Sequence, residues 1–231
     1  MDFKDLFKLS LIVSVMLLQQ GCSSDDDSRT SKVVLGVSDK ISALNELQYQ
    51  YAVVVQVAEL DGAPIPNATV SLTLKATGYY KGEYFPIDTS VPADFIADEW
   101  GQFVTVTCAA EDANNNGVLD AGEDINFNGL IDPHIPSITP DLSEEPTLIP
   151  GTQRLITDDS GFGYFTITYP KAEGTWVDIE ISASISGGLP ENQDRQAFTL
   201  NVLKSEIEEI GVFHAFLTSP YGTAGACNDP T

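Results

Sequence analysis

The feature that most constrains the fold is a series of short apolar runs, rich in β-branched residues and separated by turn residues. About seven runs of this kind occur, at residues 49–57, 68–74, 79–85, 103–108, 163–169, 176–183 and 197–203. The run at 68–74 places Val70, Leu72 and Leu74 on one face, which is the alternation of a half-buried strand. No long helical period occurs, and only residues 38–47 favour a short helical turn. The sequence therefore predicts an all-β fold, arranged as a β-sandwich.

Residues 111–132 interrupt the strands with a dense run of Asp, Asn and Gly. Acidic or amide residues alternate at positions 1, 3 and 5 of a twelve-residue loop, a glycine follows at position 6, and a glutamate closes position 12. Such a loop surrounds one calcium ion with oxygen atoms. The expected ligands of this first loop are Asp112, Asn114, Asn116, the Val118 carbonyl, Asp120 and Glu123.

A second loop begins where the first loop ends. Its expected ligands are Asp124, Asn126, Asn128, the Leu130 carbonyl and Asp132. Position 12 is Ile135, so the bidentate carboxylate must come from elsewhere, and Glu111, Glu144 and Glu145 are the nearby candidates. A solvated turn is the alternative for both loops, since Asn, Asp and Gly favour turns in any case.

The two loops resemble those of EF-hands, dockerins and thrombospondin type 3 repeats. An EF-hand needs a helix on each side, but a β-branched run precedes these loops and Pro133 and Pro136 follow them. The resemblance is therefore closer to the thrombospondin arrangement, a loop wound on calcium ions. It implies Ca²⁺ as the cofactor.

The N-terminus has the pattern of an export signal. Lys4 and Lys8 precede an apolar segment at 9–18, which is too short to span a bilayer. The following Gly21-Cys22 resembles a bacterial lipobox, which implies cleavage after residue 21, lipidation of Cys22 and an outer-membrane location, either periplasmic or surface-exposed. Residues 22–32 would form a flexible tether. The alternative is an ordinary signal peptide with Cys22 as a structural cysteine.

Two cysteines remain after Cys22. Cys108 and Cys227 form an even pair in a chain that is expected to enter an oxidising compartment, so we predict one disulfide between them. Two separate buried thiols are the alternative.

Two further segments carry a resemblance to bacterial immunoglobulin-like domains of the invasin and intimin type. Residues 61–72 contain a glycine and two prolines before a strand, and residues 157–165 contain a Thr-Asp-Asp-Ser-Gly turn before a strand. The resemblance implies an immunoglobulin-like β-sandwich over residues 33–203, with the acidic segment 109–153 as an insertion. Residues 204–231 would form a tail docked on the sandwich.

Charge and motifs limit the function. The net charge of −23 repels nucleic acid and anionic lipid surfaces, so we expect no nucleic-acid partner. The chain contains no Gly-x-Ser-x-Gly, no His-Glu-x-x-His and no phosphate loop, and we expect no enzymatic activity. We expect a calcium-binding, lipid-anchored cell-envelope protein that serves in adhesion or assembly, with an unknown protein or glycan partner. The alternative is a surface hydrolase or a carbohydrate-binding accessory lipoprotein.

Overall fold

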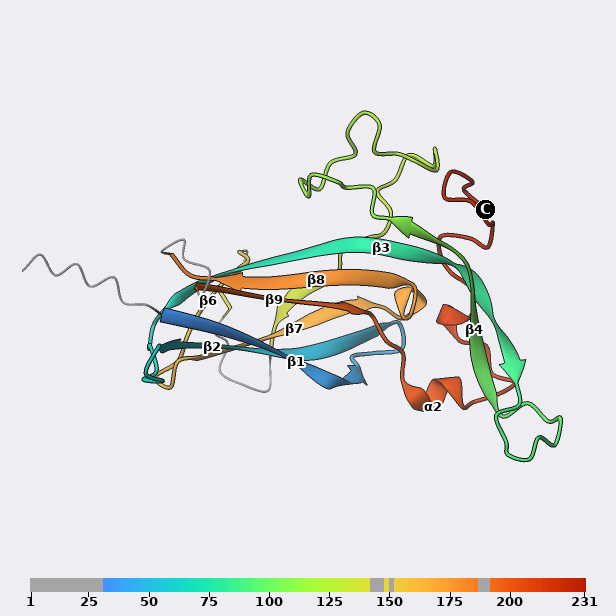
Figure 1. Ribbon diagram of the computed structural model, residues 1–231, viewed down its shortest axis with the longest axis horizontal. Coiled ribbons are helices and arrows are strands. Elements are labelled where there is room, and N and C mark those ends of the chain that lie inside the picture. The colour runs from blue at the N-terminus through green and yellow to red at the C-terminus, as the bar shows by residue number, and fades with distance from the viewer. Residues whose placement is uncertain (1–30, 142–147, 150–151, 187–191) are drawn as a thin grey trace, which may run out of the picture.

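The chain folds into two antiparallel β-sheets that face each other across one core (Figure 1). The computed structural model describes residues 31–141, 148–149, 152–186 and 192–231. The expected signal peptide at 1–21, Cys22 and the tether up to residue 30 lie outside these residues, as do Glu144 and Glu145. The predicted all-β class is confirmed, and the two sheets form a sandwich.

The first sheet has the strand order β1-β2-β7-β5 and the second the order β4-β3-β8-β9, with β6 paired to β3. The strands of the first sheet are β1 (Ser31–Ala43), β2 (Gln48–Glu59), β7 (Phe162–Pro170) and β5 (Ser137–Pro140). Those of the second sheet are β4 (Glu99–Ala109), β3 (Thr69–Ile87), β8 (Val177–Ser184), β9 (Gln193–Thr199) and β6 (Arg154–Ile156).

The core follows from the period-two pattern of the central strands. Every second residue of β2 from Tyr49 to Val57 is buried, and β8 buries Val177, Ile179, Ile181 and Ala183 in the same way. Side chains that alternate in this manner cover one face of each sheet with apolar surface. Trp176, which is fully buried, lies immediately before β8 and donates its indole N–H to the carbonyl of Phe216 at 2.7 Å.

Three details differ from the sequence-based expectation. The helical turn predicted at 38–47 is wrong, because β1 continues to Ala43 and pairs with β2 through Ile41 and Tyr51. The runs at 68–74 and 79–85 are one strand, β3, which bends at a bulge beside Gly82. Segment 109–153, predicted to be an insertion, is partly built into the sandwich, because its strand β5 pairs with β7.

The C-terminal segment packs on the second sheet through two short helices, α2 (Lys204–Ile207) and η3 (Ala215–Leu217). Phe216 is fully buried and meets the Tyr84 ring edge-on at 5.4 Å. A third short helix, η1 (Lys171–Glu173), follows β7. Within the described residues, no helix has the length and apolarity needed to span a membrane.

Candidate calcium-binding loops

The Asp/Asn run leaves the sandwich at the end of β4 and returns to the same place. Ala110 donates its backbone N–H to the carbonyl of Thr77 on β3 at 3.4 Å, and Glu111 donates to the carbonyl of Asp132 at 2.8 Å. The two ends of the run are therefore held together over β3. Figure 1 shows the run projecting from the second sheet.

The first loop winds around the carboxylate of Asp112. Its two oxygens accept the backbone N–H groups of Asn116 and Gly117 at 3.0 and 2.9 Å. Gly117 has φ = +73°, a left-handed conformation that glycine adopts without steric cost. The glycine at position 6 is thus needed to turn the backbone N–H groups toward position 1.

Glu123 closes this first loop. Its carboxylate accepts the N–H of Ala113 at 3.1 Å and the N–H of Asp120 at 2.9 Å. These are positions 2 and 9 of the loop. One glutamate therefore fastens the start of the loop to its far side.

The second loop repeats the first one. The carboxylate of Asp124 accepts the N–H groups of Asn128 and Gly129, both at 3.1 Å. Gly129 has φ = +76°, close to the value at Gly117. The backbone therefore adopts the same turn twice, twelve residues apart.

Glu111, one of the three candidates for the missing carboxylate, closes the second loop through hydrogen bonds. Its carboxylate accepts the N–H of Ile125 at 3.0 Å, the N–H of Asn126 at 3.2 Å and the N–H of Asp132 at 3.1 Å. Ile125 and Asp132 are positions 2 and 9, the same positions that Glu123 holds in the first loop. Each glutamate stands immediately before the first aspartate of one loop and closes the other loop, so the two loops are reciprocally fastened.

The amide side chains of each loop converge on its position-9 aspartate. Nδ2 of Asn114 and Nδ2 of Asn116 both lie 2.8 Å from one oxygen of Asp120. Nδ2 of Asn126 and Nδ2 of Asn128 both lie 2.7 Å from one oxygen of Asp132. A half turn of an amide about χ2 exchanges its nitrogen and oxygen, so the same side chains can present oxygen to the centre of each loop.

The acids do not form a cation site by themselves. Among the described residues, no three His, Cys, Asp or Glu side chains gather into a group that could hold a metal ion. The carboxylates instead face backbone N–H groups. Val118 and Leu130 at position 7 have hydrocarbon side chains, so only their backbone carbonyls can be ligands. Any ion must therefore be shared between carboxylates, amides and carbonyls.

The two loops differ in burial. Both loops expose most of their residues, but loop one buries only Asp112, whereas Asn126, Asp132 and the closing Glu111 are buried at loop two. Burial raises the pKa of Glu111 above its usual value, although its backbone hydrogen bonds act in the opposite direction. Tyr79 on β3 is fully buried beneath the second loop, and burial together with the charges of Glu111 and Asp132 raises its pKa to about 12.

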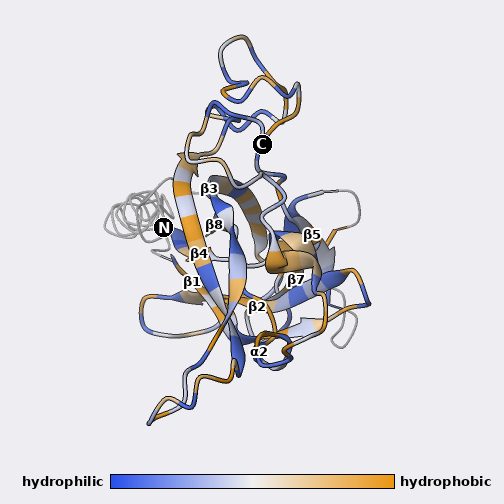
Figure 2. Cartoon of the chain, turned by 90° about the vertical axis from the view of Figure 1, so that its right-hand side faces the viewer, coloured by the Kyte–Doolittle hydropathy of each residue, from blue (hydrophilic) through white to orange (hydrophobic). Residues whose placement is uncertain are grey.

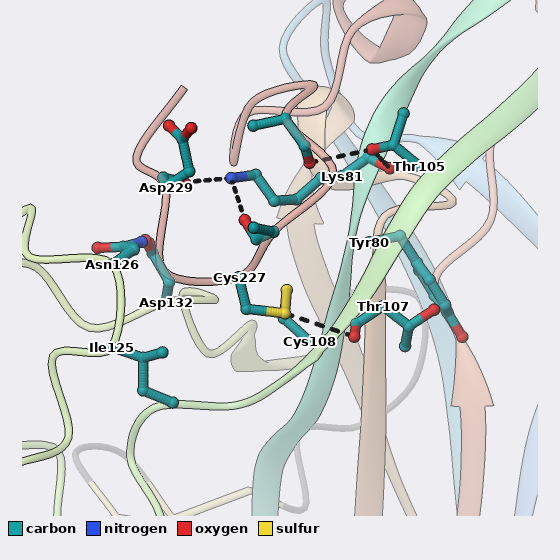
Figure 3. The surroundings of a disulfide bond; sticks show 12 residues. Tyr80, Lys81, Thr105, Thr107, Cys108, Ile125, Asn126, Asp132, Cys227 and Asp229 are labelled. Carbon is teal, nitrogen blue, oxygen red and sulfur yellow. Dashed lines mark hydrogen bonds between the residues drawn. A yellow bond between two sulfur atoms is a disulfide. The ribbon is translucent and has the colours of Figure 1, made fainter.

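The C-terminal tail forms the other side of this environment (Figure 3). Cys108 at the end of β4 forms a disulfide with Cys227, as the sequence predicted. Lys81, buried on β3, donates from Nζ to the carbonyl of Ala226 at 3.2 Å and to the carbonyl of Asp229. Sequence reasoning missed Tyr79 and Lys81, because nothing in their local pattern shows that the tail and loop two meet on β3.

A comparison with known protein families, curated proteins and solved structures finds no significant match to this chain. The function must therefore be argued from the loops and their surroundings.

Proposed function

We propose that residues 111–132 bind two calcium ions and that these ions order an acidic platform on the second sheet. The observation that carries this proposal is the repeated closure of the loops. The same positions of two successive twelve-residue segments are fastened by Glu123 and by Glu111. An incidental turn would not be expected to repeat the same hydrogen-bonded positions twelve residues later, with each glutamate closing the other loop.

The donor chemistry fits calcium. A hard cation of this size takes six to eight oxygen ligands and tolerates carboxylates, amides and carbonyls together. The first ion would be held by Asp112, Asn114, Asn116, Val118, Asp120 and Glu123. The second would be held by Asp124, Asn126, Asn128, Leu130, Asp132 and Glu111. The ion supplies positive charge to a segment that has nine acidic residues and no Lys or Arg between positions 111 and 150.

Calcium would act on stability rather than on a reaction. Closely spaced carboxylates repel one another, and an ion bound only by the folded loops stabilises them by mass action. Loop two is joined to β3 through Tyr79 and to the tail beside the disulfide, so its ion would stabilise the fold beyond the loop itself.

The wider proposal is a non-enzymatic, immunoglobulin-like protein of the bacterial outer membrane, attached through lipid on Cys22. The disulfide supports export to an oxidising compartment. The calcium-ordered platform would serve adhesion or assembly with a protein or glycan, and the net charge of −23 disfavours nucleic acid.

The hydrolase or carbohydrate-binding alternative needs an aromatic cleft with two facing acids. A cavity of about 350 Å³ on β8 and β9 is lined by Glu180, Ser182, Gln193, Asp194 and Arg195. It has no aromatic wall for a sugar ring to stack on. This cavity does not favour the alternative.

The proposal is tested by calorimetric titration of the full chain with calcium, together with thermal unfolding in calcium and in excess chelator. We expect two ions per chain and an unfolding midpoint that falls by several degrees on chelation. Calcium should restore the midpoint and magnesium should not, since magnesium demands a smaller, octahedral site.

The matched control is Asp159→Asn, which removes one exposed carboxylate far along the chain from the loops. This variant should keep both ions and the same chelator response. A midpoint that chelator leaves unchanged, with no calcium heat, would sink the proposal and leave the run as a solvated turn.

A further inference from the structure

The surface in question is the outer half of the β3–β4 hairpin, residues 83–104, which we call the hairpin end. β3 pairs with β8 only as far as Tyr79, and beyond Tyr80 its strand partner is β4. The hairpin therefore extends past the sandwich. Figure 1 shows it at the end of the molecule opposite the start of β1 at Ser31.

The outer edge of β4 is open. β4 is the last strand of its sheet, and within the described part of the chain its backbone groups from Glu99 to Cys108 make no backbone–backbone hydrogen bond outside the β3 ladder. Gln102, Phe103, Val104 and Thr105 are exposed in succession. Their contacts to other segments are through side chains, from Gln102 to the carbonyl of Thr175 at 2.9 Å and from Thr105 to the carbonyl of Ala224 at 3.2 Å, which leaves the backbone edge open. Edge strands are normally protected by Lys, Pro or a bulge. Residues 100–104 contain no Lys or Pro, and the bulge comes only at Thr105.

The loop at the tip presents apolar side chains to solvent. Val91, Phe95 and Ile96 are 96%, 93% and 68% exposed. Figure 2 shows hydrophobic residues along β4 and in the loop beyond it. Three exposed apolar residues within six positions of one loop are concentrated as in interaction surfaces.

Hydrogen bonds fix the conformation of this tip. The carboxylate of Asp88 accepts the N–H groups of Ser90 at 2.9 Å and of Phe95 at 2.6 Å, and Asp98 accepts the N–H of Thr89 at 2.9 Å. Phe95 is held at φ = +63°, which is rare for an aromatic residue. An apolar anchor that is ordered before binding loses less conformational entropy on association.

The charges around the open edge indicate which kind of partner it can bind. Asp88, Asp94, Asp98 and Glu99 lie at the tip, and the acidic run from Glu111 lies beyond the other end of β4. No Lys or Arg occurs between positions 82 and 153. This charge opposes a second copy of the chain and an anionic membrane. It favours a partner with positive charge at both ends of an uncharged centre.

We infer that the open edge of β4 takes up an extended segment of a partner polypeptide whose centre is uncharged and β-branched and whose ends carry Lys or Arg. The segment adds to the second sheet as a further antiparallel or parallel strand. Backbone hydrogen bonds supply affinity, while the apolar tip and the acidic ends supply selectivity. The inference does not depend on calcium binding.

The probe is a fluorescein-labelled peptide, Lys-Lys-Thr-Val-Thr-Val-Thr-Lys-Lys, whose binding to the full chain is followed by fluorescence anisotropy. Two further peptides are N-methylated at alternate residues, one at the odd and one at the even positions. In a peptide strand added to this edge, only every second backbone N–H points toward β4. Methylation of one set should therefore weaken binding at least about tenfold, and methylation of the other set should leave it nearly unchanged.

Two charge reversals test the contribution of the acidic end. Glu99→Lys should weaken binding of the unmodified peptide at least about threefold at low salt and less at high salt. Asp159→Lys makes the same charge change in the turn before β7, away from β4, and should not weaken binding to that extent. The peptide comparison uses the unaltered chain, so it remains decisive even if Glu99→Lys folds poorly.

Four outcomes would overturn the inference. The first two are absence of peptide binding and equal effects of the two methylation patterns. The third is a dimer, seen by sedimentation, that excludes the peptide. The fourth is binding of phosphatidylcholine vesicles that is abolished by Phe95→Ser and is not competed by the peptide. The dimer would assign the edge to a second copy, and the vesicle result would assign the tip to a lipid surface.

Discussion

The two Asp/Asn loops have nearly the same local structure in different surroundings. In both, an aspartate at position 1 accepts the N–H groups of positions 5 and 6, and a glutamate fastens positions 2 and 9. Loop one nevertheless buries only Asp112, while loop two buries both Asn126 and Asp132 next to Tyr79 and the disulfide-bonded tail. The repeat dictates the shape of each loop, and the packing decides what that loop contributes to the whole fold. We expect loop two to be coupled to global unfolding and loop one to open locally.

The largest expected effect comes from removing the disulfide beside loop two. A double variant with Cys108→Ser and Cys227→Ser releases a cross-link between residues 119 positions apart. In the chain-entropy account, the loss of free energy of unfolding is about 4–5 kcal/mol. Urea unfolding of the variant and the parent chain measures it. Calcium affinity should fall at loop two more than at loop one, and an equal fall at both loops would contradict the comparison.

A pH-dependent change in the free energy of unfolding is also expected on the side of loop two. Glu173 on η1 is buried, and its carboxylate lies 3.6 Å from Nδ1 of His134, position 11 of loop two. Burial raises the pKa of Glu173 to about 7, and the charge of Asp132 adds to the rise. A carboxyl whose folded pKa is raised contributes full stability below its unfolded pKa, and this contribution is lost as the pH rises through the folded pKa.

We therefore expect the free energy of unfolding to fall by about 3 kcal/mol at most between pH 4.5 and pH 8 through Glu173. Glu173→Gln should remove this slope, which urea unfolding at several pH values measures. Glu123→Gln, on the exposed loop, serves as the matched control and should leave the slope in place. The expectation fails if the Glu173→Gln variant keeps the full pH dependence.

The reciprocal glutamates give the sharpest test of the two loops. Glu111→Gln and Glu123→Gln should each reduce the stoichiometry from two calcium ions to one, because each removes a bidentate carboxylate. Glu111→Gln should also cost about 1–3 kcal/mol, since its buried carboxylate accepts three N–H groups. Glu123→Gln should cost less, because water can reach its partners. Calorimetric titration and thermal unfolding measure both quantities, and loss of the same ion in the two variants would refute the reciprocal arrangement.

The strands and the loops were predictable because both depend on local patterns. β2 and β8 follow the period-two alternation, and the position-6 glycines mark both turns. β1 was mistaken in part for a helical turn, since residues 38–40 are polar and largely exposed and only pairing with β2 extends the strand past them. Local pattern fails where a neighbouring strand decides the conformation.

The closure of loop two could not be chosen from sequence alone. Glu111 was one of three candidates, and its position beside loop two depends on the hydrogen bond between Glu111 and Asp132 that brings the two ends of the run together. The repeat did contain a usable signal, since Glu111-Asp112 and Glu123-Asp124 are identical pairs twelve positions apart. The burial of loop two had no such signal, because it depends on Tyr79 and on the tail, which are distant in sequence.

The smallest expected effect concerns position 4, where the two loops use different residues in the same conformation. Asn115 has φ = +56° and Phe127 has φ = +60°. Asparagine adopts this left-handed region far more readily than phenylalanine, and Phe127 is 81% exposed, so its ring packs against little. Phe127→Asn should therefore stabilise the chain by about 0.5–1 kcal/mol, and Asn115→Phe should destabilise it by a similar amount, both measured by urea unfolding.

The two substitutions at position 4 should also report on different openings of the molecule. Because we expect loop one to open locally, the change at Asn115 should appear mainly in the hydrogen exchange of loop-one amides, whereas the change at Phe127 should appear in global unfolding. A loss of stability on Phe127→Asn would show that contacts of the ring hold loop two in place. Side-chain packing, rather than backbone strain, would then be what distinguishes the two loops at this position.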